Sequence, residues 1–239
     1  MGSSRPGANG RREARASAHR ARVDSRTLRR MYTPKANEET RVEVLHALVR
    51  AHPLGTWTLF DGADLMTNHV PFHLDVDRGP FGTLVGHVAR ANPVWRAAAS
   101  TVRSVVVFQG PQAYVTPSWY PSKVEHGKTV PTWNYAVVHA RGVPAFTHAR
   151  DWLLAHVSGL TDAHEAAESA PWAVADAPDD YVERQLGAIV GVEIPIERLL
   201  GKWKASQNRS SEDRAGVVLG LRGRGDHASA DLVPTSEEA

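Results

Sequence analysis

Aromatic and polar side chains gather between residues 114 and 139 in a pattern that suits a flat, phosphorylated ligand. The aromatic members are Trp119, Tyr120, Trp133 and Tyr135. A planar ring can stack on such side chains, while Ser118, Thr132 and Asn134 can hydrogen-bond its polar edge. The ammonium of Lys123 can neutralise a phosphate. The segment therefore predicts a cofactor site, and the alternative is that strand aromatics of this kind belong to a core or a subunit interface.

A second candidate group lies further upstream, around Arg90. Asn92 is well placed to cap a short helix with Pro93 as its first residue, so Arg90 stands just before a helix N-terminus. Backbone N–H groups and the helix dipole attract anions there, and a guanidinium offers phosphate a planar, permanently charged fork. We therefore predict an anion site at Arg90; the alternative is that Arg90 and His87 lie on a solvated strand end.

Composition and failed motifs exclude several kinds of chemistry. The chain has no cysteine, which excludes disulfides, thiolate catalysis and thiolate metal sites. The run from His164 to Glu168 approaches the zinc-protease helix motif, but Glu168 replaces the second histidine. No nucleophile-elbow pattern and no basic recognition helix can be placed. We expect no metal site, no serine-hydrolase chemistry and no helix-turn-helix.

Charge is distributed unevenly along the chain. Residues 1–30 hold nine Arg against Glu13 and Asp24, whereas the formal net charge of the whole chain is +2. This composition predicts a disordered basic extension that could contact DNA, and the alternative is a merely solvated tail. We divide the chain into this extension, one domain over residues 31–221 and a disordered tail over residues 222–239. Without a secretory signal or a bilayer-length apolar stretch, a soluble cytoplasmic protein is expected.

The pattern of elements favours an α+β fold. Predicted strands cover residues 54–60, 64–70, 82–89, 103–108, 112–115, 130–143 and 190–196. Predicted helices begin at the Asn37 cap, follow Asn92, cover residues 147–160, 161–169 and 179–189, and run from Ser210 or Ser211 to about Leu221. Because most strands cluster between residues 54 and 143 with turns between them, we expect an antiparallel β-barrel with peripheral helices.

Several blocks resemble one protein family in order and spacing. They occupy residues 69–72, 86–95, 108–111, 113–123, 130–135, 138–140 and 206–209. The blocks Tyr-Val-Thr-Pro-Ser-Trp-Tyr-Pro-Ser-Lys and Val-Pro-Thr-Trp-Asn-Tyr are the most distinctive of these. Together they make the chain similar to the PaiB-type family of FMN-binding proteins, over about residues 31–221.

The resemblance implies a split barrel related to the pyridoxamine-phosphate-oxidase-like flavoproteins, dimeric, with FMN bound between subunits. It also implies roles for the candidate residues. Arg90 and Lys123 would contact the phosphate, with His87, Ser118 and Thr132 as hydrogen-bonding partners. Trp119 or Trp133 would lie near the flavin ring, and Asn134 would be a further cofactor contact. His69, His139 and Arg209 are candidates for residues that surround the site without forming these contacts.

Three functions remain open at this point. The family description implies a negative transcriptional regulator, in which any DNA contact would fall to the basic extension. A flavin-dependent oxidoreductase is the second, in which the protein positions a substrate against the ring. Haem binding or degradation is the third, since related barrels handle haem and the chain offers twelve His.

Overall fold

The structure, a computed structural model, describes residues 31–97 and 102–235. Contacts divide the chain into two units, Met1–Tyr32 and Thr33–Ala239, and the elements described below belong to the second. The basic extension over residues 1–30, with its predicted disorder and DNA contact, lies outside the described residues.

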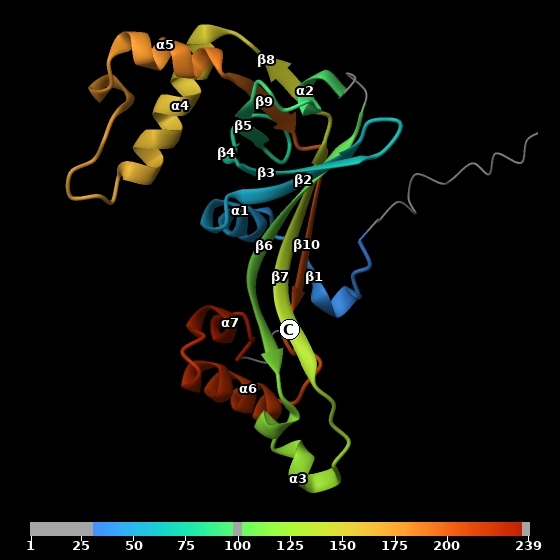
Figure 1. Ribbon diagram of the computed structural model, residues 1–239. Coiled ribbons are helices and arrows are strands. Elements are labelled where there is room, and N and C mark those ends of the chain that lie inside the picture. Colours follow the sequence, from blue (N-terminus) through green and yellow to red (C-terminus); the bar gives the residue numbers. More distant parts are fainter. Residues whose placement is uncertain (1–30, 98–101, 236–239) are drawn as a thin grey trace, which may run out of the picture. The chain divides into compact units, whose positions relative to one another are not determined.

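Two antiparallel sheets form the body of this unit (Figure 1). The six-stranded sheet has the order β1 (Glu38–Glu39), β10 (Arg198–Lys204), β7 (Thr132–Gly142), β6 (Ser104–Val115), β2 (Leu54–Phe60) and β3 (Leu65–Pro71). The four-stranded sheet has the order β4 (His73–Asp75), β5 (Thr83–Ala89), β9 (Ile189–Pro195) and β8 (Ala145–Thr147). Every strand pair in both sheets is antiparallel.

The main core lies between the inner faces of the two sheets. Its strand members alternate with half-buried residues, as a sheet with one covered face requires. Within the core, the ring of Phe72 meets those of Trp57 and Phe108 edge-on, each at a centroid distance of 6.3 Å. Helix α1 (Val42–Ala51) closes this core because Leu45 and Val49 point inward at helical spacing. The predicted α+β antiparallel fold with peripheral helices is confirmed.

The helices pack around the two sheets. They are α1 (Val42–Ala51), α2 (Val94–Ala97), α3 (Ser122–His126), α4 (Arg150–Glu165), α5 (Asp179–Gly187), α6 (Ser211–Gly223) and α7 (His227–Asp231), with 3-10 turns η1 (Lys35–Asn37), η2 (Pro117–Trp119) and η3 (Val174–Asp176). Helix α4 packs on the four-stranded sheet and α1 on the inner face of the six-stranded sheet.

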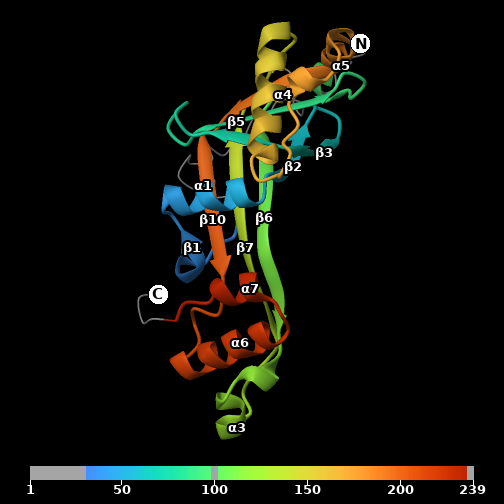
Figure 2. The same ribbon diagram turned by 90° about the vertical axis from the view of Figure 1, so that its left-hand side faces the viewer.

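Beyond the last pair of β10 with β7, which joins Lys204 and Tyr135, the ends of β6 and β7 continue as a two-stranded arm, which carries α3, α6 and α7 at its far end (Figure 2). A second hydrophobic cluster holds this end together. Its buried members are Ala113, Val115, Tyr120, Val217, Leu221, Ala230 and Val233. The arm therefore has a core of its own.

Four sequence expectations are wrong in detail. Gly110 and Pro111 do not form a turn between two strands: they form a bulge within β6, where the register with β7 shifts between Gln109 and Gln112. The helix expected from the Asn37 cap begins only at Val42. The two helices expected over residues 147–160 and 161–169 are one helix, α4 (Arg150–Glu165), and Thr147 ends strand β8 instead of capping a helix. The described part of the C-terminal tail is ordered as α7, because its apolar residues complete the second cluster.

Candidate functional site

Ser118, Trp119 and Lys123 lie at the far end of the arm, in η2 and α3. The indole of Trp119 packs against Gly220 of α6, and the guanidinium of Arg224 lies 4.3 Å from its ring centroid. Ser118 and Lys123 are exposed. Trp119 thus serves the contact between arm and helix, while the other two side chains face solvent.

Thr132, Trp133 and Asn134 open β7 and point to alternate faces. Trp133 is 48% exposed, whereas Asn134 is fully buried. The amide Nδ2 of Asn134 donates to Ser206 Oγ at 3.0 Å, and that hydroxyl donates to Asn134 Oδ1 at 3.2 Å. The ammonium of Lys204 donates to Thr132 Oγ1. Of the three, only Trp133 offers a large exposed surface.

A buried polar network joins the arm to α6. The carboxylate of Asp213 accepts from the Oγ of Ser122 at 2.7 Å and from its N–H at 3.1 Å, which fixes the start of α3. The guanidinium of Arg209 lies 4.5 Å from the ring centroid of the buried Tyr120, and burial raises the pKa of that phenol. These side chains are engaged in holding the arm, so a ligand would have to displace them.

Arg90, at the end of β5, is bound to backbone. Its Nε donates to the carbonyl of Gly187 at 2.5 Å and its Nη2 to the carbonyl of Ile189 at 2.9 Å. Asn92 does accept from the N–H of Val94 and so caps α2, as the sequence predicts. The Arg90 guanidinium, however, anchors the entry to β9, and its phosphate contact stays a prediction.

His87 forms a pair with His156 of α4. Nδ1 of His87 lies 3.0 Å from Nε2 of His156. Burial lowers the pKa of His87, and burial followed by the nearby His87 and His73 lowers the pKa of His156 to about 4. Both rings are therefore neutral near pH 7, and one N–H between them makes the hydrogen bond.

The predicted cofactor residues consequently fall into two groups. His87 and Arg90 lie on the four-stranded sheet, and the other six lie at the far end of the arm. Both views show β5 and α3 at opposite ends of the unit Thr33–Ala239 (Figures 1 and 2). One chain cannot place both groups around a single small molecule.

A continuous row of side chains crosses the outer face of the six-stranded sheet. The row, from β3 to β10, consists of His69, Thr56, Val107, His139 and Leu200. Their neighbours along the strands, such as Val106, Val138 and Val70, point into the core, so the row points away from it. Its members are half-buried or exposed. The sequence named His69 and His139, and the sheet aligns them.

His139 is the most constrained member of this row. Its Nδ1 is buried and lacks a hydrogen-bond partner within the described part of the chain. Burial, and then the charge of Arg141, lowers its pKa, so the imidazole is neutral near pH 7. The imidazole as a whole is only half-buried, so its accessible edge, rather than the buried Nδ1, can meet a polar ligand on this sheet face.

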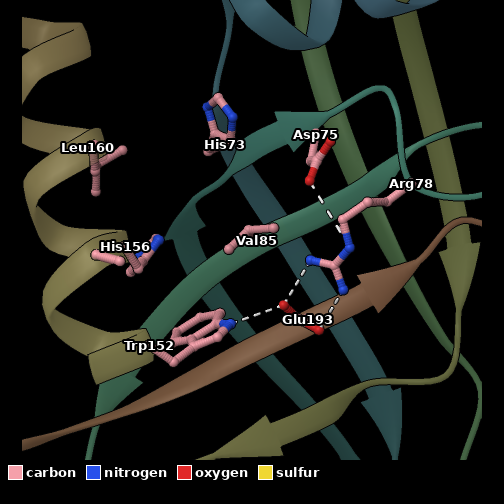
Figure 3. A pocket seen from close by; sticks show the side chains of 10 residues that line it. His73, Asp75, Arg78, Val85, Trp152, His156, Leu160 and Glu193 are labelled. Carbon is pink, nitrogen blue, oxygen red and sulfur yellow. Dashed lines mark hydrogen bonds and ion pairs between the residues drawn. The ribbon is translucent and has the colours of Figure 1, made fainter. Parts of the chain in front are cut away.

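A cavity of about 270 Å³ lies between α4 and the four-stranded sheet (Figure 3). Arg78 spans two acidic residues at its rim: Nη1 and Nη2 each donate to Glu193 at 2.8 Å, and Nε lies 3.9 Å from Asp75 Oδ2. Trp152 donates from Nε1 to Glu193 at 3.0 Å and stacks on His156. Sequence reasoning missed this cavity, because its residues come from four separate segments.

Metal-binding groups and membrane-spanning helices are both absent from residues 31–97 and 102–235. Within these ranges no group of three or more His, Asp or Glu side chains is arranged to hold a metal ion. No helix in the same ranges is long and apolar enough to cross a membrane.

Comparison with protein families settles the relationship. A family model described as "Putative FMN-binding domain" matches residues 31–198. The chain belongs to this family. The relatives include the protein "Protease synthase and sporulation protein PAI 2" of Bacillus subtilis, which is 29% identical over 80% of this chain and 89% of its own length. An uncharacterized protein of Aspergillus fumigatus is 32% identical over 87% of this chain and 97% of its own. The PaiB-type resemblance is thereby confirmed.

Solved structures of two flavoproteins have the same fold as this chain. The FAD and haem binding protein of Mycobacterium smegmatis matches with a TM-score of 0.54 at 20% identity, covering 75% of this chain and 79% of that one. The flavocytochrome Anf3 of Azotobacter vinelandii matches with a TM-score of 0.55 at 12% identity, covering 78% and 79%. At these identities the matches establish the split barrel and nothing about ligands.

Proposed function

We propose that this family member is a homodimer that binds FMN on the outer face of its six-stranded sheet. The observation that supports the proposal is the row from His69 to Leu200, in which His69 is exposed and His139 is half-buried. Histidine and threonine groups can hydrogen-bond the polar edge of an isoalloxazine, and the aliphatic members can contact its plane. The family relationship supports FMN as the ligand.

Cations stand in the next row of the same face. Arg141 of β7 pairs with Arg198 of β10 and with Val105 of β6. Guanidinium groups suit a phosphate because they can donate two parallel hydrogen bonds. We therefore assign the phosphate of FMN to this row, and FMN itself would supply any redox chemistry.

A second copy of the chain accounts for the apolar content of this face. Val105, Val107, Val137 and Leu200 are only half-buried there. A two-fold axis would let the same patch cover itself on both subunits and would enclose the ligand. Such a dimer would also bring the arm of one subunit within reach of its partner. The two groups of predicted cofactor residues, which one chain holds apart, would then be able to meet at one site.

A regulatory role completes the proposal. The relative PAI 2 is named for protease synthesis and sporulation. The discriminating measurement is oxidation of NADH and NADPH by the FMN-loaded protein. Turnover no faster than that of free FMN supports the regulator, whereas saturable turnover makes the protein an oxidoreductase.

Titration with FMN, followed by flavin absorption and fluorescence, tests the cofactor site. We expect His69→Ala and His139→Phe each to weaken binding about fivefold, because each removes a hydrogen bond worth about 1 kcal/mol. His164→Ala is the matched control, since His164 is exposed near the end of α4. Failure of the wild type to bind FMN, or equal affinities in all three variants, would refute the proposed site.

Light scattering tests the dimer. Val107→Glu places a charge in the middle of the proposed interface on a half-buried side chain, so we expect monomers and a parallel loss of FMN affinity. Val124→Glu is the control, because Val124 is 92% exposed on α3. A Val107→Glu protein that stays dimeric would move the interface elsewhere.

A further inference from the structure

We infer that the cavity under α4 is a second binding site, which takes a small primary amine with a compact apolar body. The cavity measures about 270 Å³ and lies against Val85 of β5, Leu160 of α4 and the rim of β4 (Figure 3). None of its lining residues belongs to the rows proposed for FMN, so the inference is independent of that proposal.

The walls of the cavity are fixed by close packing. The indole of Trp152 packs against β9, where a Cβ at Gly191 would approach its Cζ3 to 2.2 Å. The indole also stacks on His156 at a centroid distance of 5.2 Å. His156 is in turn tied to His87 of β5. The cavity is therefore preformed and needs no rearrangement of α4 to admit a ligand.

The charges at the rim favour a cation. Both Nη groups of Arg78 donate hydrogen bonds to the carboxylate of Glu193, which also accepts one from Trp152. The charges of Arg78 and Glu193 therefore balance each other. Asp75 is left with the loose approach of Arg78 Nε at 3.9 Å and one hydrogen bond from the N–H of Asp77 at 3.2 Å. The carboxylate of Asp75 is therefore the group with capacity for a new partner.

The remaining wall holds the imidazoles of His73 and His156 and offers apolar contact. His156 is neutral near pH 7, because burial lowers its pKa to about 4. Ala155 and Gly159, four residues apart on α4, leave room beside Leu160 and Val85 for an aliphatic or aromatic body. An ammonium group would meet Asp75 while its carbon skeleton covers the apolar floor.

Calorimetry with three probes of one shape tests the inference: 2-phenylethylamine, 2-phenylethanol and 3-phenylpropanoate. We expect the amine to bind at least tenfold more tightly than the alcohol, and the carboxylate to bind least. Asp75→Asn should abolish the preference for the amine. Asp77→Asn is the matched control and should leave it unchanged, because Asp77 is exposed and outside the cavity lining.

A second variant and a second measurement test the inference even if Asp75→Asn does not fold. Arg78→Met should strengthen amine binding, since it releases Glu193 as a further carboxylate. Amide chemical shifts of Ala155 and Gly159 should move on addition of the amine and report its location. No amine binding at millimolar concentration, tighter binding of 3-phenylpropanoate, or unchanged shifts at α4 would each overturn the inference, whatever the outcome of the FMN titration.

Discussion

Gly216→Ala is expected to lower the free energy of unfolding by about 2–3 kcal/mol. A Cβ at this position of α6 would lie 1.9 Å from the carbonyl oxygen of Trp119 and 3.1 Å from its carbonyl carbon. Backbone atoms cannot swing aside as a flexible side chain can, so α6 must move away from η2. Val217 and Leu221 would then leave the second cluster. Urea unfolding measures the loss, and hydrogen exchange of α6 locates it.

Gly223→Ala on the same helix is the control. A Cβ there meets nothing within 4 Å, and alanine is favoured over glycine in helices by up to about 1 kcal/mol. The control should therefore be neutral or slightly more stable than the wild type. Equal destabilisation by both substitutions would show that the contact with Trp119 is not what requires glycine at position 216.

The sequence predicts those parts of the fold in which local pattern and tertiary packing agree. Strand β2 alternates buried and half-buried residues, and the Asp61-Gly62 turn follows it, so this hairpin is readable from residue types. Strand β10 has no such alternation: its burial pattern is irregular, and pairing with β7 on one side and β1 on the other holds it in place. A strand stabilised mainly by its neighbours leaves a weak pattern in its own sequence.

The site is harder to predict because identical residue types serve structure and ligand. Asn134 has the chemistry of a cofactor contact, yet Ser206, which is distant in the sequence, engages its amide inside the arm. Arg90 has the chemistry of a phosphate contact, yet it donates to the carbonyl of Gly187, before β9, and to that of Ile189, the first residue of β9. In contrast, the alignment of His69 with His139 depends on two intervening strands, and no local spacing reveals it.

Mild acid is expected to loosen α4 from the four-stranded sheet. The neutral forms of His87 and His156 are favoured in the folded state, since both pKa values lie below the ordinary 6.5. The unfolded chain therefore binds more protons than the folded one as the pH falls from about 6.5 toward 4, and stability present above pH 6.5 is lost across that window. Because the His156 ring is partly exposed, we discount the effect to about 1–2 kcal/mol.

His156→Gln separates this effect from other titrations. Glutamine can keep a hydrogen bond to His87 but takes up no proton, so the fall in the urea midpoint between pH 7.5 and pH 5 should shrink. The exposed His164 supplies the control, because His164→Gln leaves the pair intact and should titrate like the wild type. The range ends at pH 5 because the pKa of Glu193, on the facing strand, lies below 4.5 beside Arg78, so this carboxylate stays charged. If His156→Gln loses as much stability as the wild type, the acid response comes from other groups around α4. These include His73 and Asp75 on β4, and Glu183 of α5, which is ion-paired with Arg150 of α4.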